Sequence, residues 1–512
     1  MSKAKKTFIL SLLLFCLPLC GCTKRVKLGG ETFPADSQTV KSVVTAEELE
    51  TLDSFEALSS ADLSGSSCYE EIAAWAAAHP EVELRYTVSF PGGISAVNTD
   101  RSLDLSSLDG PALAEALPLL EWLPALENVN LGSDTLGPEA LCSLVSAYPG
   151  TEFEYRFRLL GRNTSLDDST LDLSAAGSRD MKELLAWLPA MTRLERVNLG
   201  LEADRAEPWA WEDIAALQAA LPNAVFEYDF SLYGKNFSLT DTQMDLNHIA
   251  IDDEGALVLQ VAKCMPGLTY LDMDFCGVSD EHMAQIRDAL PNADVVWRIW
   301  FGTGYSVRTD VEMILASNPG RGGELTGENT RSLQYCTKVK YLDLGHNSYL
   351  NDVSFLSSMP DLEVLIIAMG NWSDISPLAN CPKLEYAEIQ TSALNDLSPL
   401  AGLKNLRHLN IGYCFALHDL SPIYELELDR LWIGCLTPIP AEQVEIYREK
   451  HPGCSINTST IDPCAEGWRY TGANAWGSMD LDPRYELLHR QFRYSEKPYA
   501  YWDNDPLYYP HG

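Results

Sequence analysis

The sequence predicts an α/β solenoid: a curved parallel sheet with helices on its convex side in the N-terminal half and short irregular rungs in the C-terminal half. Two repeats predict this class, one with a period of 22 to 23 residues within 336–436 and one with a period of about 70 residues within 46–335. A solenoid adds core one repeat at a time, which suits a chain of 512 residues better than a single globular core does.

The shorter repeat joins an L-x-x-L-x-L strand to a turn such as DISPL or DLSPL. Successive members of its first apolar column are 23, 22, 22 and 22 residues apart: Val339, Leu362, Leu384, Leu406 and Leu428. No rung can bury its apolar side without a neighbour stacked against it. These motifs resemble the leucine-rich repeat family, and the short turns resemble the internalin type found on bacterial surfaces. Asn347 and Cys414 stand at the Asn/Cys position of that family.

The longer repeat has as its landmark a proline that follows a helix-like run and precedes an alternating strand. These prolines are 69, 73 and 69 residues apart: Pro80, Pro149, Pro222 and Pro291. No linker separates the units, so we interpret residues 46–335 as degenerate α/β leucine-rich repeats that continue into the rungs of 336–436. Four separate small α/β domains are the alternative. We expect residues 311–335, which are rich in glycine, to be a loop insertion, either a lid or a disordered segment.

The N-terminus predicts export. Three lysines precede the apolar run 8–19, which is too short for a comfortable membrane-spanning helix. Residues 19–22, Leu-Cys-Gly-Cys, resemble the lipobox of bacterial lipoproteins. That resemblance implies a signal peptide over 1–21 and a diacylglyceryl anchor on Cys22, which would tie a surface-exposed protein to the cell membrane. An ordinary cleaved signal is the alternative. We expect residues 22–45 to be a polar tether.

The charge excludes one class of partner. The chain has 73 acidic and 37 basic residues and a formal net charge of −36. Nucleic acid and other polyanions would be repelled by most of the molecule. We therefore predict no nucleic-acid partner.

The C-terminal region, 437–512, begins with a final copy of the helix-then-proline pattern, which predicts a capping helix and strand. Residues 467–512 then contain eleven aromatic residues, Trp468 among them. They are either a packed cover for the last apolar rung or an aromatic platform for sugar rings or a partner protein. Cys454 and Cys464 flank a loop rich in Ser, Thr and Asn, so they are a candidate disulfide, with two free thiols as the alternative. Most of the other cysteines lie within the repeats, where we expect a cysteine to be a small, buried, apolar side chain.

Acidic residues recur after the long strands. Asp100, Asp168, Asp241 and Asp310 each follow a strand-ending glycine, and the first three have a second aspartate four residues later. Such pairs could hold a hard cation, but we interpret them as acceptors of backbone N–H groups in the turn. The nine histidines are scattered outside any catalytic or zinc-binding motif. We therefore predict no enzyme activity, no metal site and no cofactor.

The function that these patterns favour is recognition of a protein or peptide by a monomeric surface lipoprotein. The ligand is expected on the outward residues of the short rungs, a mixed acidic and aromatic face. Its candidate residues are Tyr341, Asp343, Glu363, Glu385, Tyr386, Glu388, His408, Asn410 and Trp432. The alternatives are a surface hydrolase or glycan-binding protein that uses the aromatic tail, and a structural envelope component.

Overall fold

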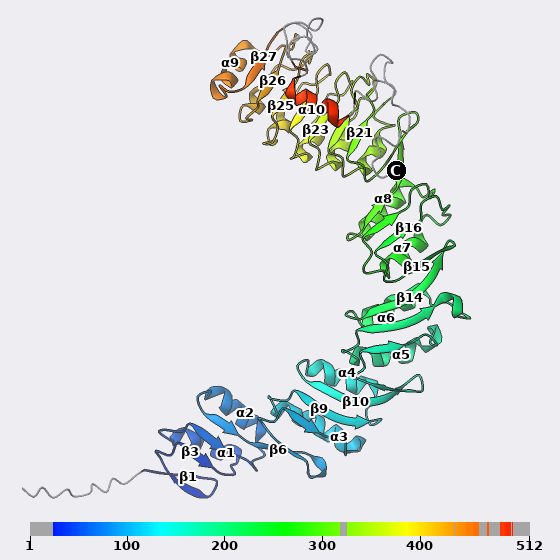
Figure 1. Ribbon diagram of the computed structural model, residues 1–512. Coiled ribbons are helices and arrows are strands. Elements are labelled where there is room, and N and C mark those ends of the chain that lie inside the picture. Colours follow the sequence, from blue (N-terminus) through cyan, green and yellow to red (C-terminus); the bar gives the residue numbers. More distant parts are fainter. Residues whose placement is uncertain are drawn as a thin grey trace, which may run out of the picture. The chain divides into compact units, whose positions relative to one another are not determined.

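The computed structural model describes residues 24–317, 325–434, 436–459, 468–469, 482–492 and 494. The chain divides into two compact units, residues 1–227 and 228–512 (Figure 1). Both are built from short parallel strands that are joined by helices or turns.

The start of the first unit is folded, although the sequence predicts a tether there. Val26 and Leu28 alternate with polar residues and are buried, and Gly29 and Gly30 both adopt the positive φ that a tight hairpin turn requires. Val40 is buried in the next strand. The tether prediction is therefore wrong for the strands β1 (Arg25–Leu28), β2 (Glu31–Pro34) and β3 (Thr39–Lys41).

The rest of the first unit repeats parallel strands, helices and antiparallel hairpins. Sheet β3-β4-β5 is parallel, and in sheet β11-β10-β9-β8 only β11 runs antiparallel to its neighbour. The strands are β4 (Ser60–Asp62), β5 (Glu83–Arg85), β6 (Thr87–Ser89), β7 (Ser95–Val97), β8 (Ser102–Asp104), β9 (Asn128–Ser133), β10 (Glu152–Leu159), β11 (Arg162–Ser165), β12 (Thr170–Asp172) and β13 (Arg196–Leu201). The helices are α1 (Ala46–Leu49), α2 (Tyr69–Ala78), α3 (Gly110–Ala116), α4 (Pro138–Ala147), α5 (Met181–Trp187) and α6 (Trp211–Ala220).

The second unit begins with the same type of repeat. Two antiparallel hairpins, β14–β15 and β19–β20, flank the parallel sheet β16-β17-β18 along the chain. The strands are β14 (Val225–Leu232), whose first residues end the first unit, β15 (Lys235–Ser238), β16 (Gln243–Asp245), β17 (Tyr270–Asp272), β18 (Asp294–Val296), β19 (Arg298–Phe301) and β20 (Tyr305–Arg308). The helices are α7 (Ala256–Lys263) and α8 (Asp280–Ala289).

A seven-stranded parallel sheet follows, in the order β21 to β27. Its central residues form one inward column of aliphatic side chains: Ile314, Leu342, Leu365, Ala387, Leu409, Leu431 and Ile456. The strands are β21 (Met313–Leu315), β22 (Tyr341–Asp343), β23 (Val364–Ile366), β24 (Tyr386–Glu388), β25 (His408–Asn410), β26 (Arg430–Trp432) and β27 (Ser455–Asn457). Short 3-10 helices return the chain across the other side: η7 (Arg331–Tyr335), η8 (Ser354–Ser358), η9 (Ser376–Asn380), η10 (Ser398–Leu400) and η11 (Ser421–Ile423). The predicted stacking of rungs is therefore confirmed for this array.

The first rung of this sheet replaces the loop insertion that we predicted over 311–335. Met313, Ile314 and Leu315 pair in parallel with β22, and residues 331–335 form η7. Ile314 precedes Leu342 by 28 residues, six more than the rung period, and this extra length hid the rung in the sequence. The insertion prediction is wrong for the described part of this stretch, and residues 318–324 lie outside it.

The last rung ends in the capping helix and strand that the sequence predicts. Helix α9 (Ala441–Lys450) buries Val444 and Tyr447, and β27 pairs in parallel with β26. The Tyr447 hydroxyl donates to the carbonyl of Leu426 at 2.6 Å, which ties α9 to the preceding rung. The remaining helix, α10 (Pro483–Gln491), is not part of the stack.

Candidate functional site

The outward face of the seven-stranded sheet consists of two columns of side chains, because alternate residues of a strand point to opposite sides. The first column is Met313, Tyr341, Val364, Tyr386, His408, Arg430 and Ser455. The second is Leu315, Asp343, Ile366, Glu388, Asn410, Trp432 and Asn457. Seven of the nine predicted face residues stand in these columns, and Glu363 and Glu385 directly precede β23 and β24.

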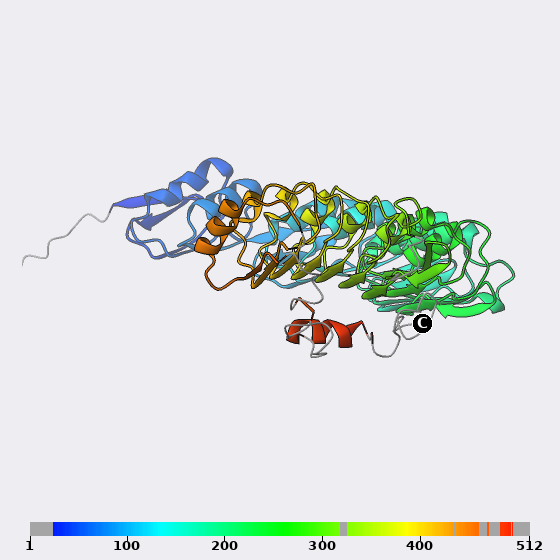
Figure 2. The same cartoon turned by 90° about the horizontal axis from the view of Figure 1, so that it is seen from above.

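This face is covered by the tail, a name we use for residues 468–469, 482–492 and 494. Figures 1 and 2 show α10 against the strands, on the side away from the 3-10 turns. The tail and the face share one apolar cluster: Val364, Ile366, Tyr386, Trp432, Trp468, Tyr485, Leu488 and Phe492. The expectation that the face is open to solvent is therefore wrong for five of its residues, which are at least nine-tenths buried: Asp343, Tyr386, Glu388, Asn410 and Trp432.

Glu388 is the centre of the contact and is fully buried. Arg469 of the tail donates to both of its carboxylate oxygens, one of these bonds being 3.3 Å long. The indole N–H of Trp468 donates to Glu388 Oε1 at 2.9 Å, and the Tyr386 hydroxyl donates to the same oxygen at 2.5 Å. A buried carboxylate needs such partners, since an uncompensated charge is very costly in an apolar environment.

Four further polar contacts hold the tail at its edges. The Tyr494 hydroxyl donates to Asp343 Oδ2. Arg430 of β26 donates to the carbonyl of Trp468 at 3.1 Å and pairs with Asp482 at 3.0 Å. Arg484 approaches Glu385 at 3.6 Å.

Cations and rings alternate across the contact. The Arg430 guanidinium lies 5.0 Å from the Trp468 ring centroid, and Arg469 lies 5.0 Å from that of Tyr485. Trp468 packs against Tyr386 and Trp432, with centroids 5.6 and 6.0 Å apart. Each such pair adds a modest attraction to the burial of apolar area.

The electrostatics of the face depend on this burial. Burial raises the pKa of Asp343 to about 6, although its hydrogen bond from Tyr494 works in the other direction. Burial and the nearby Arg484 and Arg430 lower the pKa of His408 to about 4. Burial would also raise the pKa of Glu388, but Arg469 outweighs it and holds the pKa of this carboxyl below its usual range.

Some polar atoms of the face are left without a hydrogen bond. Among the described residues, none lies within bonding distance of His408 Nδ1, Asn410 Nδ2 or Trp432 Nε1, although all three atoms are buried. These atoms lie on the adjacent strands β25 and β26. The tail therefore excludes water from this part of the face without satisfying all of its donors.

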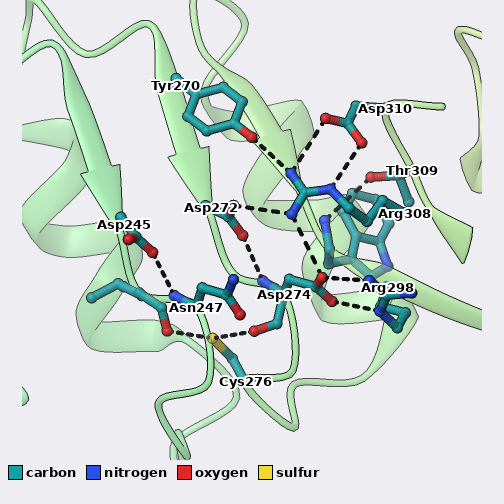
Figure 3. A network of polar contacts seen from close by, with 12 residues as sticks. Asp245, Asn247, Tyr270, Asp272, Asp274, Cys276, Arg298, Arg308, Thr309 and Asp310 are labelled. Carbon is teal, nitrogen blue, oxygen red and sulfur yellow. Dashed lines mark hydrogen bonds and ion pairs between the residues drawn. The ribbon is translucent and has the colours of Figure 1, made fainter. Parts of the chain in front are cut away.

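A second polar cluster lies in the second unit, beside β17 (Figure 3). Arg308 of β20 contacts Asp272, Asp274 and Asp310 at 3.1, 3.5 and 3.2 Å, and its Nη2 donates to Tyr270 at 2.7 Å. Burial would lower the pKa of Arg308, but Asp310 and Asp272 raise it above its ordinary value. Every charged group of this cluster has a partner within the protein, so we interpret the cluster as structural.

Arg298 completes that cluster. It donates to both carboxylate oxygens of Asp274, at 3.0 and 2.8 Å, and its guanidinium lies 4.6 Å from the ring centroid of Phe275. Asp310 thus pairs with Arg308, and our turn interpretation is wrong for it. For Asp100, Asp168 and Asp241 that interpretation is confirmed, because each accepts the backbone N–H of the residue three positions earlier.

Several predicted features have no test in this structure. Cys22 and Cys464 lie outside the described residues, so lipidation and the disulfide stay predictions. Cys454 is partly buried, and burial raises the pKa of its thiol to about 11. Five cysteines of the repeats are buried, as expected: Cys264, Cys276, Cys336, Cys381 and Cys414. In the described part of the chain, no three His, Cys, Asp or Glu side chains converge in a way that could hold a metal ion.

Sequence reasoning missed the partners of Glu388. Trp468 is one of eleven aromatic residues between 467 and 512, and no motif marks Arg469. The sequence offers one weak signal: of the other six strands of this sheet, three carry Asp or Asn at this position and none carries Glu. The cover predicted for the last rung lies instead across the outward face, at least for the described tail residues.

Parallel strands joined by helices or 3-10 turns recur in both units, which is an α/β repeat architecture. Among solved structures, the chain is similar to internalin F of Listeria monocytogenes, at 13% identity over 76% of this chain and 89% of that one, with a TM-score of 0.23. It is also similar to internalin C2 of the same species, at 17% identity, 52% and 90% coverage and a TM-score of 0.17. A leucine-rich repeat protein of Leptospira interrogans matches at 13% identity, 83% and 96% coverage and a TM-score of 0.19.

Two other comparisons found nothing: no protein-family model and no curated protein matches this sequence. Within the described residues, no helix has both the length and the apolar character needed to cross a bilayer.

Proposed function

We propose that the protein is a bacterial surface lipoprotein, anchored through Cys22, that binds a protein or peptide through the outward face of its short rungs. One observation carries the ligand part of this proposal. The face already buries a stretch of polypeptide through aromatic, aliphatic and arginine side chains, so its shape and chemistry suit a peptide. The lipobox-like residues 19–22 support the anchor.

Photo-cross-linking on intact cells tests the ligand part. A photoreactive amino acid is placed at His408, which is half-buried on the face, and in a matched variant at Asn405, which is exposed on the same rung just before β25. We expect an intermolecular adduct from position 408 and none from position 405. Equal adducts from both positions, or none from position 408, would overturn the assignment of the face.

The anchor has its own test. A Cys22→Ala variant should lose incorporation of labelled fatty acid and should move from the detergent phase to the aqueous phase on phase separation. A Cys20→Ala variant is the control and should remain lipidated, because the resemblance assigns the lipid to Cys22 alone. Unchanged partitioning of the Cys22 variant would exclude the anchor.

A further inference from the structure

The outward face does not depend on the tail for its structure. The inward column is buried by the stack itself from Ile314 to Leu431, and the backbone of each strand is paired within the ladder. Among the described tail residues there is one helix and no strand that joins this ladder. The tail is therefore held by side chains on a finished face, as a bound peptide is.

Glu388 is specialised for a partner outside its own rung. At many other strand ends an Asp or Asn oxygen accepts the backbone N–H two residues later: Asp62, Asp104, Asn130, Asp172, Asn198, Asp245, Asp272, Asp343, Asn410 and Asn457. The longer side chain of Glu388 instead reaches Trp468 and Arg469. A fully buried carboxylate requires a cation, so whatever occupies the face has to present one there.

The surroundings of Glu388 specify the rest of the occupant. Tyr386 and Trp432 form an aromatic wall against which Trp468 packs. Next to it, Val364 and Ile366 receive the apolar side of α10, which contributes Tyr485, Leu488 and Phe492. Glu363 and Glu385 add negative charge at the border of the face, which favours a basic occupant.

We infer that the outward face of β22–β26 is a binding site for a peptide that presents an arginine next to an aromatic residue, together with an amphipathic helix, and that the tail is its internal competitor. This inference rests on the proposed function and gives the chemistry of its ligand. Because the tail belongs to the same chain, it competes at an effective concentration on the order of millimolar. An external ligand gains access when it makes better contacts, for example with the unsatisfied donors of Asn410 and Trp432.

A peptide added in trans tests this inference. The probe is a fluorescent synthetic peptide with the sequence of residues 466–494. The proteins are the full chain and a full-chain variant, Arg469→Ala with Phe492→Ala, whose face is unchanged but whose own tail is weakened. We expect the variant to bind the probe at least about tenfold more tightly than the unmodified protein. Adding Glu388→Gln to the variant, or Arg469→Ala to the probe, should reverse this gain.

A second measurement covers the case in which the tail variant does not fold. In the unmodified protein, the backbone amides of Glu486 and Phe492 in the tail should exchange with solvent at least about a hundredfold faster than those of Leu344 and Ile411 in the rungs. Equal exchange rates would overturn the inference, because the tail would then open only when the array unfolds.

Other occupants give other outcomes. Dimers of the tail variant in analytical ultracentrifugation, in place of probe binding, would overturn the inference in favour of a second copy of this chain. If a partner is cross-linked at position 408 and the probe does not displace it, this inference is overturned but the proposed function is not. If the probe binds but no partner is cross-linked, the proposed function is overturned but this inference is not.

Discussion

Arg469 donates two hydrogen bonds to the carboxylate of Glu388, a residue 81 positions earlier in the chain. The pair is shielded from water, since Glu388 is fully buried and the Arg469 side chain is 19% exposed. Trp468 and Tyr386 also donate hydrogen bonds to Glu388 Oε1. The C-terminal segment is thereby attached to the middle of the repeat array.

Replacing Glu388 by Gln should release the tail. The substitution keeps the shape but removes the charge that Arg469 and its neighbours compensate, and breaking a buried pair costs about 3 to 5 kcal/mol. Trypsin should then cleave after Arg484 and Arg490 about a hundredfold faster, because cleavage follows the population of the open state. Glu385→Gln is the matched control, since Glu385 is exposed and contacts Arg484 only at 3.6 Å. Equal cleavage of the two variants would contradict a central role for Glu388.

Tail docking should weaken as the pH falls from 7 toward 4.5. Burial lowers the pKa of His408, His346 and His489, so the docked state holds fewer protons at these groups than the released state. Asp343 contributes to the pH dependence of docking in the opposite direction. Its pKa is raised to about 6, so the docked state binds a proton there as the pH falls. Glu388 acts in the same direction as the histidines, because Arg469 outweighs burial and lowers its pKa in the docked state. Four groups therefore oppose Asp343, and docking weakens in acid.

Two variants separate these contributions. Asp343→Asn removes the opposing group and should make the loss of docking in acid steeper. His408→Gln should make it shallower, because burial lowers the pKa of His408 to about 4 and the substitution removes that titration. The measurement is binding of the probe peptide between pH 4.5 and 7.5, in the background of the weakened tail. Identical slopes in the two variants would show that these residues do not titrate with docking.

The repeat period was sufficient to predict the array but not the tail. Leu342, Leu409 and Leu431 recur at multiples of the rung length, and each lies in the buried inward column of its strand. Such contacts join neighbouring repeats, so a periodic pattern reports them. The contact between Glu388 and Arg469 spans 81 residues and occurs once, so no period reveals it. Within the sheet, only the presence of Glu at a position that carries Asp or Asn in three other strands distinguishes it.

Residues 25–41 and 311–317 show a second limit of the pattern. Both contain strands, β1 to β3 and β21, that nearby glycines or irregular spacing made resemble linkers. In each case three or four residues were enough to pair with a neighbour. Short strands are stabilised mainly by the ladder that they join, which the local sequence does not contain.

The disulfide between Cys454 and Cys464 remains a prediction with a direct test. Under the proposed function both residues lie outside the cytoplasm, where disulfides persist. Peptide mass mapping without reduction should show residues 454 and 464 in one cross-linked fragment, and Cys454→Ser should abolish it. If Cys454 alkylates fully under denaturing, non-reducing conditions, the pair does not form. A raised thiol pKa of about 11 makes Cys454 slow to react in the native protein, so denaturation is required.

The buried ion cluster around Arg308 should contribute strongly to stability in its part of the second unit. Arg308→Met keeps much of the volume but leaves Asp272, Asp274 and Asp310 without their shared cation. We expect a loss of about 3 to 5 kcal/mol at pH 8, read from urea unfolding and from faster exchange of the Met273 amide, which donates to the carbonyl of Val296.

The loss should be smaller at pH 5 than at pH 8. Without Arg308, burial and mutual repulsion raise the pKa of the three carboxyls in the folded state, so protonation relieves the penalty as the pH falls. Lys338→Ala is the matched control, because Lys338 pairs with Asp294 at 2.7 Å but both side chains are about half exposed. Removing that pair should cost less than about 1 kcal/mol, with little dependence on pH. An Arg308 variant as stable as the Lys338 variant would show that the three carboxyls need no cation.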